Sequence, residues 1–148
     1  MKTSHAVLAA AAVGAAGLAL SERHNRQRLV LHAAQMHQAW IAEVASNPEL
    51  RAVWTPPGGD LPAEEYTQLL HCNRLISFLA AKYRVGLLDR HALRAQARWL
   101  MERDVARKYW AKFGDYRWEE AMGRTDHIFN AIMADEYAAY SDEDAVAV

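Results

Sequence analysis

Pairs of neighbouring carboxylates are the first residues of this 148-residue chain whose types could support chemistry. They occur at Glu64-Glu65, Glu119-Glu120 and Asp135-Glu136. General acid–base catalysis needs two carboxyl groups in different environments around one substrate. The first pair instead falls where a helix begins, a position at which negative charge stabilises the free N–H groups. The second lies in a short helix and the third in an acidic C-terminal region, so we assign no catalytic residue.

Metal-binding and nucleophile patterns are missing from the sequence as well. None of the seven histidines has the Glu-x-x-His or His-Glu-x-x-His spacing of di-iron and zinc sites. His32 and His37 are five residues apart and would point in different directions on a helix. Cys72 is the only cysteine, which excludes an intramolecular disulfide and a four-cysteine zinc site. We expect Cys72 to be a buried apolar residue, and we expect no metal, no cofactor and no phosphate-binding loop.

Asn73 lies on the apolar side of the longest helix that we predict in the domain. A buried amide must find hydrogen-bond partners, because leaving it unpaired costs about 1–3 kcal/mol. We expect it to bond a loop or a neighbouring helix; fixing the register of an oligomer and lining a ligand pocket are the alternatives. Asn73 and Arg74 are therefore the predicted buried polar or interaction residues. An enzyme would need a concave polar pocket around Asn73, Cys72 and His71.

A basic stretch rich in aromatic residues is the second unusual feature. Residues 82–112 carry nine Lys and Arg against three acids, whereas residues 115–148 carry nine acids against two Arg. Basic residues between aromatics suit phosphate contacts and base stacking, and a basic helix face also suits anionic lipid. We expect the two blocks to complement each other within the fold, with those two partners as alternatives. The predicted anionic-partner face is Arg90, Arg94, Arg98, Arg107 and Lys108.

These residues must be positioned by helices, whose ends are marked in the sequence by capping and helix-terminating residues. Asn47 before Pro48 is typical of a helix start, and Gly86 is typical of a helix end. Asp89 and Asp104 are predicted to cap two further helices. No stretch alternates polar and apolar residues as a strand does. The sequence predicts an all-α fold, a single domain of about six to seven helices preceded by an N-terminal apolar helix. The helices are expected at 29–46, 48–54, 62–84, 89–101, 104–114, 116–122 and 126–140.

The apolar helix is expected at residues 6–20, an uncharged run of Ala, Leu, Val and Gly. With residues 3–5 and 21 it would span about 28 Å, close to the ~30 Å hydrocarbon core of a bilayer. Three interpretations stay open: a membrane anchor, a secretory signal with the cleavage pattern Gly17-Leu18-Ala19, and a soluble Ala-rich helix. Three Arg within 21–28 and a lone cysteine favour an anchor with the domain in the cytoplasm.

A set of short motifs resembles an uncharacterised actinobacterial family that is known only as a domain of unknown function. The resemblance covers about residues 29–139. It implies an N-terminal hydrophobic helix followed by a compact helical domain, and it implies no activity, cofactor or catalytic residue. The motifs are Asn47-Pro48-Glu49-Leu50, Asn73-Arg74, the run from Tyr83 to Leu88, and Tyr109-Trp110 before Phe113-Gly114.

These observations predict three segments: an apolar helix at 1–21, a helical domain at 22–140 and an acidic disordered tail at 141–148. The predicted function is a single-pass, membrane-tethered interaction module that binds a protein partner or itself. An anionic membrane surface is a further partner, nucleic acid is disfavoured, and neither catalysis nor a small-molecule substrate is inferred. The alternatives are a soluble nucleic-acid-binding or regulatory protein that uses the basic helices at 90–112, and an exported protein whose signal is cleaved.

Overall fold

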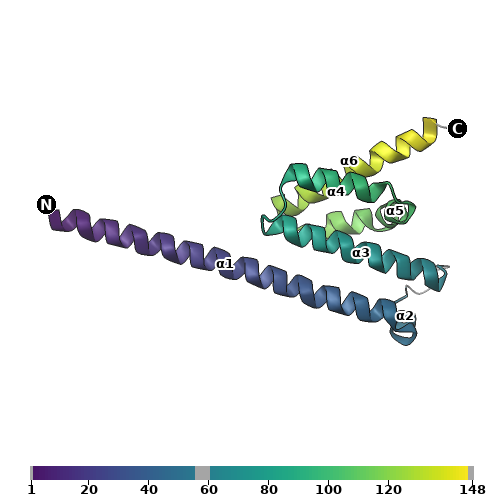
Figure 1. Ribbon diagram of the computed structural model, residues 1–148, viewed down its shortest axis with the longest axis horizontal. Coiled ribbons are helices and arrows are strands. Elements are labelled where there is room, and N and C mark those ends of the chain that lie inside the picture. Colours follow the sequence, from purple (N-terminus) through teal and green to yellow (C-terminus); the bar gives the residue numbers. More distant parts are fainter. Residues whose placement is uncertain (1, 56–60, 147–148) are drawn as a thin grey trace.

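The computed structural model describes the backbone of residues 2–55 and 61–146, and the side-chain environment of residues 5, 11–55 and 61–140. Within these ranges the chain is helical and contains no strand, so the all-α prediction is confirmed. Figure 1 shows a long rod, α1, whose second half lies along α3 and whose first half extends away from the other helices. The helices are α1 (Lys2–Ser46), α2 (Pro48–Trp54), α3 (Ala63–Arg84), α4 (Arg90–Met101), α5 (Asp104–Glu119) and α6 (Arg124–Val146).

Local signals in the sequence set several of these helix ends. The Asn47 side chain accepts hydrogen bonds from the backbone N–H groups of Glu49 and Leu50, and therefore caps α2 as predicted. The Asp89 carboxylate accepts from the backbone N–H of Ala92 at 2.8 Å and caps α4. Gly86 follows α3 with a φ of 79°, a left-handed conformation that favours glycine and lets the chain reverse.

Other boundaries differ from the prediction. α5 continues through Gly114 instead of ending there, because that glycine is buried and a Cβ on it would lie 3.3 Å from the indole nitrogen of Trp110. The position requires a small residue for packing and not a helix stop. Asp104 is the first residue of α5 and not its cap, and its carboxylate binds the Lys108 ammonium one turn later at 3.0 Å.

The structure describes only part of the predicted N-terminal segment, the loop after α2 and the C-terminal tail. α6 runs to Val146, six residues beyond the expected end at residue 140. The side chains of the predicted tail at 141–148 and all of residues 147–148 lie outside the described residues, as do residues 56–60 of the predicted loop. The side chains of residues 6–10, which begin the uncharged run, also lie outside them.

Two hydrophobic cores hold the helices together. The larger one lies among α3, α4, α5 and α6, and its fully buried members include Ile76, Leu93 and Met133. Cys72 is buried in this core, as expected of a small apolar residue. The smaller core joins the end of α1 to α3 through Ile41, Val44, Ala45, Tyr66 and Leu70.

Residues 11–26 of α1 lie outside both cores. Every side chain from Ala11 to Arg26 is exposed, and the first hydrogen bond from α1 to the domain comes from Gln27, whose side chain donates to the backbone carbonyl of Val85 at 2.8 Å. Within the described part of the chain, no helix combines the length and the apolar character that crossing a bilayer requires.

Candidate functional site: the cleft between α1, α3 and α5

A closed polar network joins α3 to α5 at Asn73. The Asn73 side-chain oxygen accepts hydrogen bonds from the Tyr109 hydroxyl at 2.8 Å, from the Ser77 hydroxyl at 3.3 Å and from Nη2 of Arg117. The same Nη2 also donates to the Ser77 and Tyr109 hydroxyl oxygens, each at 2.9 Å, and Nε of Arg117 donates to Tyr109 at 3.1 Å. Each hydroxyl thus accepts from Arg117 and donates to Asn73.

The positive charge of Arg117 has no direct counter-charge within the described residues. Its three partners in the network are neutral, and burial raises the pKa of the Tyr109 phenol, which keeps that group protonated at neutral pH. No carboxylate among the described side chains lies within ion-pair distance of Arg117. Glu120, the residue that follows α5, is an exposed acid that borders the same cleft.

A cleft of about 350 Å³ opens over this network. Its size falls in the range of small-molecule sites, which combine apolar walls with a few polar groups. Its polar side chains are those of Asn73, Ser77, Tyr109, Arg117 and Glu120. Its remaining walls are aromatic and aliphatic, and they come from three helices: His37, Trp40, Tyr66, Leu69, Leu70, Phe113 and Tyr116.

The aromatic walls are fixed by ring contacts. Trp40 stacks on His37 with 6.1 Å between ring centroids, and it forms a T-shaped contact with Trp54 at 5.3 Å. Tyr109 packs on Phe113 with 5.1 Å between ring centroids. Burial and, to a smaller extent, the positive charge of Arg117 lower the pKa of His37, against an opposing effect of Glu120. His37 is therefore a neutral ring at pH 7, and the cleft has one cation and one carboxylate.

The predicted interaction residue Arg74 does not face this cleft. Its Nε donates to the Gln38 side-chain oxygen at 3.0 Å, and the Gln38 amide donates back to the Arg74 carbonyl at 2.7 Å. This reciprocal pair fastens α1 to α3. Cys72 is buried and His71 is exposed, and neither lines the cleft at Asn73, so the residues named for an enzyme pocket are not gathered around it.

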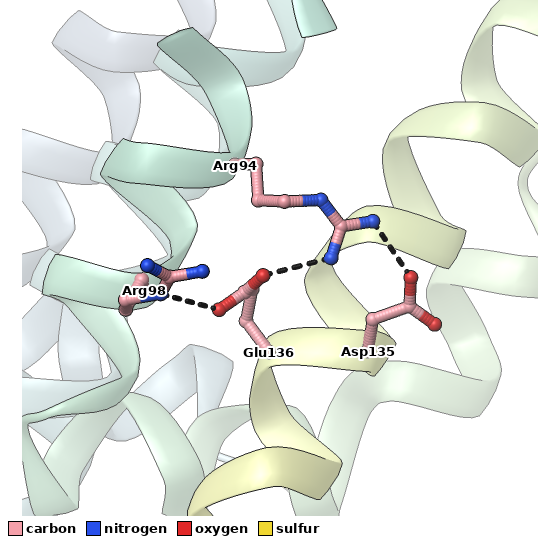
Figure 2. A network of polar contacts seen from close by, with 4 residues as sticks. All are labelled: Arg94, Arg98, Asp135 and Glu136. Atoms are coloured by element: carbon pink, nitrogen blue, oxygen red, sulfur yellow. Dashed lines mark hydrogen bonds and ion pairs between the residues drawn. The ribbon is translucent and has the colours of Figure 1, made fainter. Parts of the chain in front are cut away.

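Part of the predicted anionic-partner face is occupied by acids of α6. Arg94 binds Glu136 and Asp135, each at 2.8 Å, and Arg98 binds the second oxygen of Glu136 at 3.1 Å. Figure 2 shows the two arginines of α4 converging on the adjacent acids. The hydrogen bonds to Asp135 and Glu136 raise the pKa of Arg94. The basic and acidic blocks of the sequence therefore complement each other between α4 and α6.

The other three basic residues are distributed differently. Nη1 of Arg107 donates to the carbonyl of Met101 at 2.7 Å, and Lys108 pairs with Asp104. Arg90 is exposed and borders a wide, open hollow between α1 and the turn after α3. The structure thus engages four of the five predicted residues in contacts within the fold.

The cleft contains residues that the sequence interpretation did not select. Arg117 was counted as one of the two Arg in the acidic block at 115–148, and His37 was considered only as a metal ligand. One signal for the α5 wall was present, because Tyr109, Phe113, Tyr116 and Arg117 recur at three- and four-residue spacing and share a helix face. Among the described residues, no three His, Cys, Asp or Glu side chains are placed to hold a metal ion.

Comparison with known proteins identifies one family. Residues 2–147 match a family of unknown function, DUF6082. The match is longer than the expected 29–139 and includes α1, and it confirms the resemblance to a domain of unknown function; an actinobacterial origin stays a prediction. No curated protein and no solved structure matches the chain.

Proposed function

We propose that this chain, which belongs to the DUF6082 family of unknown function, is a helical interaction module tethered to a membrane through the first half of α1. The observation that carries the proposal is the exposure of the side chains from Ala11 to Arg26. Val13 and Leu18 are each 74% exposed and Leu20 is 56% exposed. Apolar side chains that the fold does not cover are suited to an apolar environment outside the fold.

The distribution of charge along α1 supports a bilayer as that environment. Between Lys2 and Glu22 the sequence carries no Lys, Arg, Asp or Glu on any side of the helix. A helix that is apolar all round suits surroundings that are apolar all round, whereas a helix lying on a membrane surface has a charged face. Arg23, Arg26 and Arg28 follow the uncharged run and favour a domain on the cytoplasmic side.

Fractionation of cells that express the full chain tests the tether. We expect the chain to stay in the membrane fraction after a carbonate wash, with Met1 and residues up to Leu20 intact by mass spectrometry. Replacing Val13 and Leu18 together by Glu should release it, because a charged residue at the centre of an inserted helix costs about 2.5–3.5 kcal/mol.

Met122→Glu is the matched control, since Met122 is 96% exposed on the domain and the change should leave the distribution unaltered. A chain that begins at Leu20 would indicate export after cleavage and overturn the proposal. An intact chain in the soluble fraction would also overturn it.

A further inference from the structure

We propose that the cleft between α1, α3 and α5 binds a small, singly charged organic anion with a flat apolar body, and that Arg117 holds its carboxylate. This ligand site does not depend on the membrane tether. The inference rests on three features of the cleft. Arg117 has no ion-pair contact with a described carboxylate, the walls are aromatic and aliphatic, and one acid, Glu120, borders the same cleft.

The first feature is the unused capacity of Arg117. All the hydrogen bonds that Arg117 donates to described residues come from Nε and Nη2. Nη1 has no acceptor among those residues. Asn73, Ser77 and Tyr109 fix the guanidinium in place without neutralising it, so it is an oriented donor before any ligand arrives. A carboxylate is a strong partner for a guanidinium, because the hydrogen bonds between them are charge-assisted.

The second feature is the shape and chemistry of the walls. Trp40, Tyr66 and Phe113 line a volume of about 350 Å³, enough for a ligand of one or two rings. Aromatic side chains favour flat partners that stack on them or meet their edges. Inorganic phosphate would leave these walls in contact with water and is the poorer match.

The third feature is Glu120, which borders the same cleft. Its negative charge repels a second charge on the ligand, and it therefore favours a monoanion over a dianion such as a phosphate monoester. The anion and the ring must be parts of one molecule, since the cation lies beside the aromatic walls.

Calorimetric titration of the full chain with 2-naphthoate, and with its uncharged analogue 2-naphthamide, tests the site. We expect naphthoate to bind at least about tenfold more tightly than naphthamide. Arg117→Gln should abolish this preference. Arg90→Gln is the matched control because it removes the same charge from an exposed arginine outside the cleft, and it should keep the preference.

A measurement on the unaltered chain covers the case in which the Arg117 variant does not fold. On addition of naphthoate we expect the NMR signals of the Arg117 Nε–H and the Trp40 indole N–H to shift, while the indole signal of the exposed Trp99 stays in place. Equal affinity for naphthoate and naphthamide would overturn the proposal. Shifts confined to residues 11–26 would overturn it as well.

Discussion

Arg117 and Glu136 illustrate two ways in which the fold treats a charged side chain. Glu136 is 4% exposed, and both of its carboxylate oxygens are bound by arginines of α4. Arg117 is held by neutral groups and borders a cleft. A fully paired charge joins helices, whereas an oriented and unneutralised charge keeps the capacity to bind another molecule.

Cys72 is a residue whose reactivity the structure predicts. Burial raises the pKa of its thiol to about 12, although the charge of Arg117 opposes the shift. The reactive thiolate is therefore scarce in the folded chain at pH 8, while an unfolded thiol has a pKa of about 8.5. We expect a disulfide reagent to label Cys72 about a hundredfold more slowly in native buffer than in urea. Similar rates in both conditions would contradict its burial.

The same shift predicts an alkaline loss of stability. The pKa of Cys72 is higher in the folded chain, so above about pH 8.5 the folded chain keeps a proton that the unfolded chain releases. The contribution of this proton to the free energy of unfolding is complete below the unfolded pKa. It declines as the pH rises towards 12.

At the scale of single helices, three local signals in the sequence predicted helix ends correctly, whereas the cap predicted at Asp104 was wrong. Asn47, Gly86 and Asp89 act through their own backbone neighbours, and the helix ends that they mark were predicted to within a residue. Gly114 could not be interpreted in this way, because its role depends on the packing of Trp110. A glycine in a sequence signals either a stop or a close approach, and only the tertiary arrangement distinguishes them.

The joint between α4 and α6 yields a matched pair of substitutions. Glu136→Gln removes the charge from a buried acid that binds Arg94 and Arg98, and we expect a loss of about 1.5–3 kcal/mol in the free energy of unfolding. Asp135→Asn alters the neighbouring acid, which binds Arg94 but is 59% exposed at its side chain, and should cost less than about 1 kcal/mol. Urea denaturation measures both losses. Equal losses would contradict the inference that the buried carboxylate of Glu136 stabilises the fold more than the exposed carboxylate of Asp135.

The turn after α3 yields a second pair. Gly86→Ala places a Cβ on a residue with a φ of 79°, and left-handed backbone costs an L-residue about 1–2 kcal/mol. Gly123→Ala is the control, because Gly123 has no such φ and its added Cβ would meet nothing within 4 Å. Gly123 precedes α6, where Ala is a poorer N-cap than Gly. We therefore expect Gly86→Ala to lower the thermal midpoint by more than Gly123→Ala does. A thermal midpoint that Gly86→Ala did not change would show that the turn relaxes without cost.

At the scale of the whole molecule, the cleft was beyond sequence interpretation. His37, Asn73 and Arg117 come from three helices, and their meeting depends on how those helices cross. Periodicity placed Asn73 on the inner face of α3. Periodicity carried no information on which helix packs against that face of α3. The fold class followed from pattern alone, whereas the site needed the packed structure.

The division of α1 into an exposed half and a packed half predicts the effect of truncation. Its first hydrogen bond to the domain comes from Gln27 and its first fully buried side chain is Ile41. A chain that lacks residues 1–21 should therefore unfold within about 0.5 kcal/mol of the full chain. Removal of residues 1–40 also deletes the bonds of Gln27 and Gln38, and should cost about 1–3 kcal/mol. Equal stability of the two truncated chains in urea would contradict this division.

The continuity of α1 also determines how the domain is rotated about the axis of this helix. Its 45 residues form one unbroken helix (Figure 1), about 68 Å long. After Gly17 its sequence contains neither Gly nor Pro, the residues at which a helix bends most readily. Whatever holds the tip of the rod therefore fixes the direction in which the cleft opens. One residue inserted near Glu22 would turn the domain by about 100° around the rod axis, whereas seven would restore its heading to within about 20°. The number of residues in α1 therefore determines the rotation of the domain about the helix axis relative to the N-terminal end of α1.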